Sequence, residues 1–141
     1  IIDEAQNLKN TTLEEVRLLS NLETEKEKLF QIVLVGQPEL REKLNSPFLK
    51  QLRQRISIRY HIPPLEKIEV AQYIFHRLKV AGSDGSITFH NNAIDEIFNH
   101  SKGVPRLINI LCDRALLAGY VMETRDITSN IIQRCIKEIE G

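Results

Sequence analysis

The chain has 141 residues, of which 42% are apolar, and nineteen basic residues balance nineteen acidic ones to give a formal net charge of zero. This length and apolar content suit one folded domain or two small ones and exclude a disordered tail. The balanced charge excludes an overall field that would draw the protein to nucleic acid or to an anionic membrane, although local patches remain open.

The sequence has no pattern typical of a disulfide framework, a metal centre or a membrane span. Cys112 and Cys135 fall on apolar faces of expected helices, which favours buried thiols in a reducing compartment. The four histidines lack the spacing of metal ligands, so we expect no metal site made of protein ligands alone. The longest aliphatic run, residues 32–35, is too short to cross a bilayer. Met122 is the only methionine, so we expect the natural chain to begin upstream of Ile1.

The chain opens with an apolar pair followed by two carboxylates, Asp3 and Glu4. This pattern is typical of the Walker B end of a core strand in a nucleotide-hydrolysing protein. Because side chains alternate along a strand, Asp3 is expected to face the water shell of a Mg²⁺ ion and Glu4 the water to be activated. The alternative is that the dipeptide merely leads into a turn and a helix.

Three helix signals and two strand signals follow in the first half of the chain. A helix is expected after Thr11 or Thr12, with Glu14 or Glu15 completing a capping box and a buried stripe of Leu13, Val16, Leu19 and Leu22. After the polar stretch 23–28, residues 30–35 predict a strand covered on both faces. Pro38 and Pro47 each predict a short helix, with Ser46 as a cap for the second. Residues 56–62 alternate, which predicts an edge or half-covered strand and completes half of a doubly wound α/β domain.

Pro63 and Pro64 end this pattern, and a helical period replaces it. Four helices are expected: one from Leu65, one after Asn91 or Asn92, one from Pro105 and one after Thr128. Four amphipathic helices of this length can close a small bundle.

Three further motifs, with four polar residues, extend the chemistry suggested by the opening carboxylates. Gln37 ends the second strand and is expected to reach the water or phosphate that Glu4 faces, unless it is only a turn residue before a proline. Arg53 and Arg55 precede the last strand and can offer a guanidinium to phosphates of a neighbouring subunit, the alternative being solvated arginines at a helix end. Arg106 stands in the first turn of a helix, where a cation opposes the helix dipole and favours a bound anion.

Together the segments IIDEAQNL, QIVLVGQPELREKL, QLRQRI and GVPRLINILCDRALLAGY resemble AAA+ ATPases, and they look very like the general secretion pathway protein A (ExeA-like) family. The resemblance covers essentially the whole chain. It implies ATP and Mg²⁺ as cofactors. By the same resemblance, Asp3 is the Walker B residue that binds the metal through water, and Glu4 is the catalytic base. Gln37 corresponds to sensor 1, Arg55 or Arg53 to the arginine finger, and Arg106 to sensor 2.

The resemblance also implies the fold and the setting. The expected fold is α/β, with residues 1–63 forming part of a parallel-sheet AAA+ core and residues 64–141 an all-α helical lid. The implied function is ATP hydrolysis by a homo-oligomer at the cytoplasmic face of the bacterial inner membrane, driving assembly of a secretion complex with inner-membrane proteins. The alternatives are a DNA-transposition ATPase of the same superfamily, which binds DNA, and an interaction module without catalysis.

One departure from the family pattern is expected to matter most. None of the six glycines stands in a G-x-x-x-x-G-K-[S/T] frame, so these residues contain no phosphate-cradling Walker A loop. We therefore expect that this loop lies upstream in the natural protein and that the 141 residues alone are inactive. The central strand and the strand flanking Walker B are then missing as well, which leaves sheet edges open to another chain.

Overall fold

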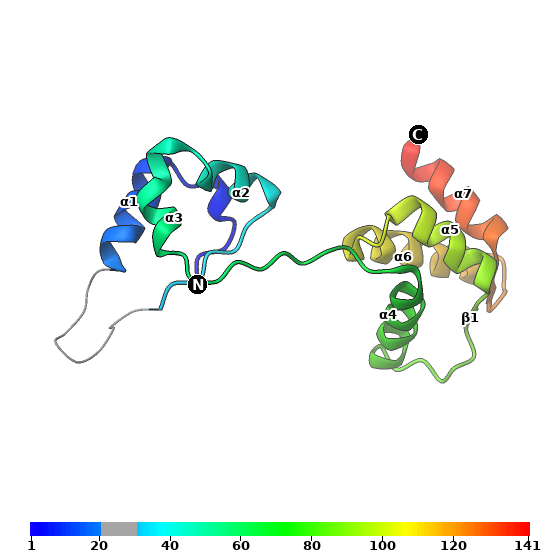
Figure 1. Cartoon of the computed structure of the whole chain (residues 1–141). Coiled ribbons are helices and arrows are strands. Elements are labelled where there is room, and N and C mark those ends of the chain that lie inside the picture. Colours follow the sequence, from blue (N-terminus) through cyan, green and yellow to red (C-terminus); the bar gives the residue numbers. More distant parts are fainter. Residues whose placement is uncertain (21–30) are drawn as a thin grey trace. The chain divides into compact units, whose positions relative to one another are not determined.

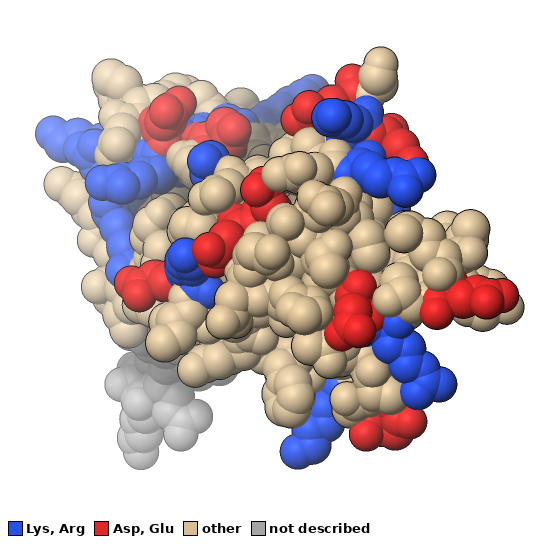
Figure 2. Space-filling view, turned by 90° about the vertical axis from the view of Figure 1, so that its right-hand side faces the viewer, with Lys and Arg blue, Asp and Glu red and all other residues tan. Residues whose placement is uncertain are grey.

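The computed structural model describes residues 1–20 and 31–141 and divides into two compact units, Ile1–His61 and Ile62–Gly141 (Figure 1). Leu22, the polar stretch 23–28 and Phe30 lie outside the described residues. Each unit has its own hydrophobic core. Acidic and basic side chains are interspersed on the face shown in Figure 2. Among the described helices, none combines the length and the apolar content needed to cross a membrane.

The first unit is built from short helices around a small leucine core. Its elements are η1 (Ala5–Asn7), α1 (Asn10–Leu19), α2 (Pro38–Leu44), η2 (Pro47–Leu49) and α3 (Lys50–Arg55). Leu13, Leu49 and Leu52 form the buried cluster that joins α1 to η2 and α3. The helices expected at Pro38 and Pro47 are confirmed, because a proline in the first turn gives up no intrahelical hydrogen bond.

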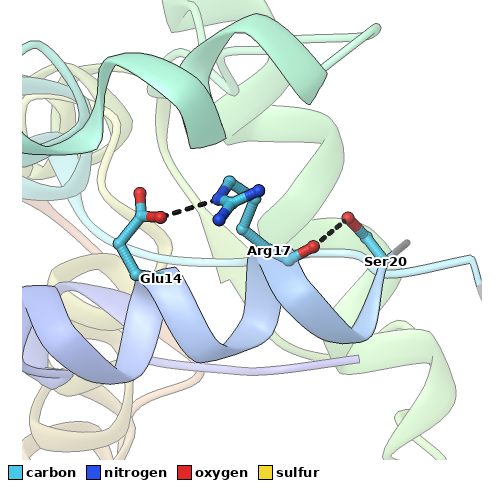
Figure 3. A network of polar contacts seen from close by, with 3 residues as sticks. All are labelled: Glu14, Arg17 and Ser20. Atoms are coloured by element: carbon cyan, nitrogen blue, oxygen red, sulfur yellow. Dashed lines mark hydrogen bonds and ion pairs between the residues drawn. The ribbon is translucent and has the colours of Figure 1, made fainter. Parts of the chain in front are cut away.

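The capping box expected for α1 is wrong. The helix begins at Asn10 with Lys9 at the N-cap position and no side-chain cap, so Thr11 and Thr12 lie inside the first turn. The preceding η1 turn leads into an extended Leu8, which lets the helix start earlier than the local pattern indicates. Further along, α1 carries a Glu14–Arg17 ion pair of 2.7 Å and a hydrogen bond of 2.6 Å from Ser20 Oγ to the Arg17 carbonyl (Figure 3).

The expected parallel pairing of the first two strand segments is confirmed, but it is short. A single parallel bridge joins Ile2 to Leu34, with hydrogen bonds of 2.8 Å from Ile2 N–H to the Val33 carbonyl and from Val35 N–H to the Ile2 carbonyl. The second segment is not covered on both faces, since Val33 and Val35 are each 45% exposed. Their outer side has no packing layer in the described part of this unit.

The third expected strand, residues 56–62, is not formed. These residues follow α3 without entering a ladder, and Ile58 and Tyr60 are 85% and 86% exposed. Alternation of apolar and polar residues predicts which side of a strand is buried, but a strand also needs a partner for its backbone groups. The described residues of the chain provide no such partner for this segment.

The second unit confirms the four expected helices. It contains α4 (Lys67–Val80), β1 (Thr88–Phe89), α5 (Asn91–Ser101), α6 (Pro105–Val121), β2 (Asp126–Ile127) and α7 (Ser129–Glu140). The core combines the buried faces of all four helices with Ile127 of β2. The parallel pair β1–β2, with Thr88 opposite Asp126, was not expected because two residues are too few to show a period.

Two of the four helix starts in this unit follow the sequence signals, whereas α5 starts one residue early and α4, expected from Leu65, begins at Lys67. Helix α6 begins at Pro105 and α7 follows Thr128, as expected. The N-cap of α5 is His90, so Asn91 lies in the helix and does not cap it. A capping box that the sequence analysis missed starts α4, where Glu66 N–H donates to the Glu69 carboxylate at 2.8 Å.

Both cysteines are free thiols of the second unit. Cys135 is 2% exposed in the core, and Cys112 is partly buried at its edge. Burial raises the pKa of Cys112 to about 12, with a further contribution from the charge of Asp113. Burial also raises the pKa of Cys135. Both groups therefore stay protonated near neutral pH, which is the state expected of packing residues rather than of reactive thiols.

A glycine turn between α5 and α6 ties the start of the second unit to its core. Gly103 adopts a φ of +78° and its carbonyl accepts a hydrogen bond of 2.9 Å from Leu65 N–H. A Cβ atom at this position would lie 2.0 Å from the Leu65 carbonyl oxygen. Only glycine therefore satisfies both the backbone conformation and the close approach.

Gly103→Ala should strongly destabilise the second unit. Left-handed backbone strain costs about 1–2 kcal/mol for alanine, and the clash with Leu65 should bring the total loss to about 3 kcal/mol or more. Gly82→Ala is the matched control, because Gly82 also has a positive φ, +86°, but open space around its Cβ position. Urea unfolding of the 141-residue chain measures both variants, and equal losses would contradict the close approach.

Candidate functional site

Asp3 and Glu4 follow the bridged residue Ile2 and form a bulge at the end of the parallel pair. In a regular parallel ladder, Glu4 N–H would donate to the Val35 carbonyl. Ala5 N–H makes that bond instead, at 2.9 Å, while Glu4 N–H donates to Asp3 Oδ1 at 2.8 Å. One extra residue is therefore inserted, as in a β-bulge, and bulges re-aim side chains.

The bulge corrects the expectation that strand alternation separates the two carboxylates. Glu4 has φ 49° and ψ 38°, in the left-handed region, so it no longer belongs to an extended strand. The period of a strand therefore does not set the direction of the Glu4 side chain relative to that of Asp3. Both side chains are exposed, and therefore accessible to solvent and to a ligand.

The Glu4 carboxylate is held by the turn that follows it. Asn7 N–H donates to the Glu4 carbonyl at 2.9 Å, and Asn7 Nδ2 donates to Glu4 Oε2 at 3.1 Å. The 3₁₀ turn η1 thus fixes the backbone of Glu4 and restrains its side chain. Sequence reasoning did not identify Asn7, because an Asn three residues after a Glu carries no specific signal by itself.

Gln37 lies at the same end of the paired segments. It is the N-cap residue of α2, and its backbone N–H donates to Gln6 Oε1 at 3.3 Å. The structure therefore brings the Gln37 backbone into contact with the turn that begins at Asp3 and Glu4. Its side chain is exposed, and its role as sensor 1 stays a prediction.

Two residues that the sequence analysis did not identify form hydrogen bonds between the η1 turn and α2. Gln6 bridges to Gln37, and Lys43 Nζ donates to the carbonyl oxygens of Gln6 and Leu8 at 2.7 and 2.5 Å. A Cβ atom on Gly36 would lie 2.8 Å from Gln6 Oε1, so the glycine leaves room for the glutamine. A lysine on a short polar helix usually indicates a solvated face, which explains why Lys43 was missed.

The candidate arginines lie at helix ends. Arg55 is exposed in the last turn of α3, and Arg53 is half-buried in the same turn with Nη1 3.5 Å from Asn45 Oδ1. A cation at a helix C-terminus is favoured by the dipole, so the helix by itself accounts for both arginines. Arg106 is exposed in the first turn of α6, in the second unit, where the dipole opposes it. Arg53 and Arg55 therefore share one helical turn of the first unit, and Arg106 belongs to the second unit.

The carboxylates fit one part of a Mg²⁺ site. Among the described residues, no group of three or more His, Cys, Asp or Glu side chains is arranged to hold a metal. Mg²⁺ commonly keeps several waters and uses only one or two carboxylates together with substrate phosphates. An exposed Asp3 beside an exposed Glu4 suits that partial role.

Glu4→Gly should stabilise the bulge relative to Glu4→Ala. Both variants lose the contact with Asn7, but only glycine relieves the left-handed backbone, which is worth about 1 kcal/mol. The Ala5 N–H donates to the Val35 carbonyl across the bulge, and the Val35 N–H donates to the Ile2 carbonyl just before it; hydrogen exchange of both amides should show about fivefold more protection in Glu4→Gly. Equal protection in the two variants would mean that Glu4 does not hold a positive φ in solution.

Comparisons with known proteins confirm the resemblance. The AAA domain family model matches residues 1–44. The whole chain is 45% identical over 141 residues to General secretion pathway protein A of Aeromonas hydrophila, covering 100% of this chain and 26% of that protein. The chain thus spans about a quarter of the length of this relative. No solved structure matches significantly. Residues 1–44 are thus similar to an AAA domain, and the chain is similar along its whole length to part of General secretion pathway protein A of Aeromonas hydrophila.

Proposed function

We propose that these residues supply the Walker B and sensor part of an ATP-hydrolysing site. The observation that carries the proposal is the bulge after the Ile2–Leu34 bridge: it bears two exposed carboxylates, and Gln6 of the turn that follows accepts the backbone N–H of Gln37. Of two adjacent carboxylates, one can serve the metal shell and the other can accept a proton. The AAA domain match to residues 1–44 supports the same assignment.

In this proposal each side chain has a distinct task. The Glu4 carboxylate takes a proton from the attacking water, and Asp3 hydrogen-bonds the water shell of Mg²⁺. Held in this way, Mg²⁺ would supply positive charge for the phosphate oxygens. Gln37 orients the water or the γ-phosphate. Arg106, which lies in the helical unit, binds a phosphate of the nucleotide. Arg55, or Arg53, completes the site of a neighbouring subunit in a homo-oligomer.

The cellular process is proposed for the natural protein that contains these residues, on the basis of the similar protein described above. The relative is named for the general secretion pathway. We propose that ATP hydrolysis drives assembly of a secretion complex at the cytoplasmic face of the inner membrane. Duplex DNA binding is less well supported, because the net charge of the chain is zero and acidic and basic side chains are interspersed on the face shown in Figure 2.

The isolated 141-residue chain should neither bind Mg-ATP tightly nor hydrolyse it. It contains no Walker A frame, and a phosphate chain needs that cradle of backbone N–H groups for tight binding. Isothermal titration calorimetry and phosphate release measure the two properties. Micromolar affinity, or turnover above that of a Glu4→Gln control prepared in parallel, would contradict the proposal.

In the full natural protein, Glu4→Gln should retain nucleotide binding and lose about 10²–10⁴-fold in kcat, because loss of a general base affects the transition state. Asp3→Asn should weaken Mg²⁺-dependent nucleotide binding as well. Fluorescent nucleotide titrations with and without Mg²⁺ separate the two effects. Glu4→Gln turnover within about threefold of wild type would remove Glu4 as the base.

Arg55 is predicted to act on the neighbouring subunit, where an arginine finger contributes about 10³–10⁵-fold to turnover. Arg55→Ala should bind ATP normally and be inactive. Mixing it with inactive Glu4→Gln protein should restore activity, because a mixed interface pairs an intact Glu4 site with an intact Arg55. Arg53→Ala is the matched variant, since Arg53 lies in the same helical turn. Mixtures that stay inactive while crosslinking shows mixed oligomers would refute action in trans.

A further inference from the structure

We propose that Gln6 and Lys43 are positioning residues of the hydrolysis site and hold the Asp3–Glu4 turn at a fixed distance from Gln37. This inference rests on the proposed function, because it explains how the same site keeps its geometry. Neither residue is part of the set that the sequence analysis assigned to catalysis. Their hydrogen bonds link the turn that carries Glu4 to the segment that carries Gln37, and the proposed reaction needs these two segments in a fixed relative position.

The need for such residues follows from the weakness of the local backbone pairing. The first two segments share one bridge, between Ile2 and Leu34, and the ladder is broken by the bulge at Glu4. Glu4 itself has a left-handed conformation that costs about 1–2 kcal/mol for a residue with a side chain. A strained turn persists only where surrounding contacts over-determine it.

Gln6 provides the first of these contacts. Its side-chain oxygen accepts the backbone N–H of Gln37, at 3.3 Å, across 31 positions of sequence. Gly36 makes this contact possible, because a Cβ atom there would lie 2.8 Å from the same oxygen. The Gln6 side chain therefore links the turn that carries Glu4 directly to the residue proposed as the sensor.

Lys43 provides the second contact and closes a ring. Helix α2 has Gln37 at its N-cap and Lys43 in its last turn, and the Lys43 ammonium donates back to the carbonyl oxygens of Gln6 and Leu8. These two carbonyl groups lie on either side of the end of η1. Gln37, α2, Lys43 and Gln6 thus form a closed path, so a movement of the η1 turn requires a movement of the whole helix.

This arrangement predicts a specific kinetic effect. A general base acts only within about 2.6–3.2 Å of the proton that it takes, and a misplacement of about 1 Å costs on the order of 100-fold in rate. Lys43 directs donors at backbone carbonyl groups and Gln6 directs an acceptor at a backbone N–H. Neither contact involves a group needed to bind nucleotide, so their loss should lower kcat and leave nucleotide affinity unchanged.

The test uses paired variants in the full natural protein. Lys43→Met and Gln6→Met keep side-chain length but remove the donors and the acceptor, and each should lower kcat by about 10–100-fold with KM within twofold of wild type. Lys43→Arg retains donors and Gln6→Glu retains an acceptor oxygen, so both should recover most of the activity. Arg41→Met, an exposed position on α2, is the control and should keep wild-type kcat.

Three further measurements make the outcome decisive. The double variant Gln6→Met with Lys43→Met should be no slower than the slower single variant, because both act through one ring. Thermal unfolding and the folded fraction are recorded for every variant. A kcat loss that merely follows the folded fraction, or no recovery in Lys43→Arg, would overturn positioning in favour of a structural role.

The failure of this inference is distinguishable from failure of the proposed function. If Glu4→Gln hydrolyses ATP at the wild-type rate, the proposed site is wrong and the positioning role falls with it. If Glu4→Gln is inactive while Lys43→Met and Gln6→Met turn over at the wild-type rate, the site stands and only the positioning role is refuted.

Discussion

The geometry of the candidate site depends on one parallel bridge, between Ile2 and Leu34, and on the bulge that follows it. Parallel pairing puts the carboxyl ends of both segments at the same edge, so polar residues that are 31 positions apart in sequence become neighbours. The inserted residue then turns Glu4 out of the strand. Without the bridge, neither Asp3 nor Gln37 would have a defined position relative to the other.

The second unit is stabilised mainly by packing of its helices. Its helices bury apolar stripes against one another, and Leu65 N–H is anchored to the carbonyl of Gly103. Arg106 is therefore carried by a helix whose position is set by a core within its own unit, including the fully buried Ile108. The first unit has fewer buried residues than the second among those that the structure describes. Its turns therefore depend more on hydrogen bonds from side chains to the backbone, such as those of Lys43.

The helices were predictable from the sequence where the signal was local. Pro38 and Pro105 each start a helix because proline fits a first turn, and Thr128 precedes α7. The capping box at Thr11 was wrong because the preceding turn, and not the threonine, decides where α1 begins. Residues 56–62 have the alternation of a strand and form none, since a strand depends on a partner that a periodic pattern cannot specify.

The candidate site was predictable in its residue types but not in its geometry. Adjacent carboxylates and the amide at the end of the next segment followed from motif order, whereas the bulge at Glu4 and the contacts of Gln6 and Lys43 depend on tertiary structure. A left-handed backbone at an exposed carboxylate costs stability, and glycine would be less strained there. The proposed function would account for this strain, because it requires the Glu4 carboxylate to reach a water beyond the end of the strand. The hydrogen bonds of Gln6 and Lys43 between the η1 turn and α2 then oppose relaxation of the turn.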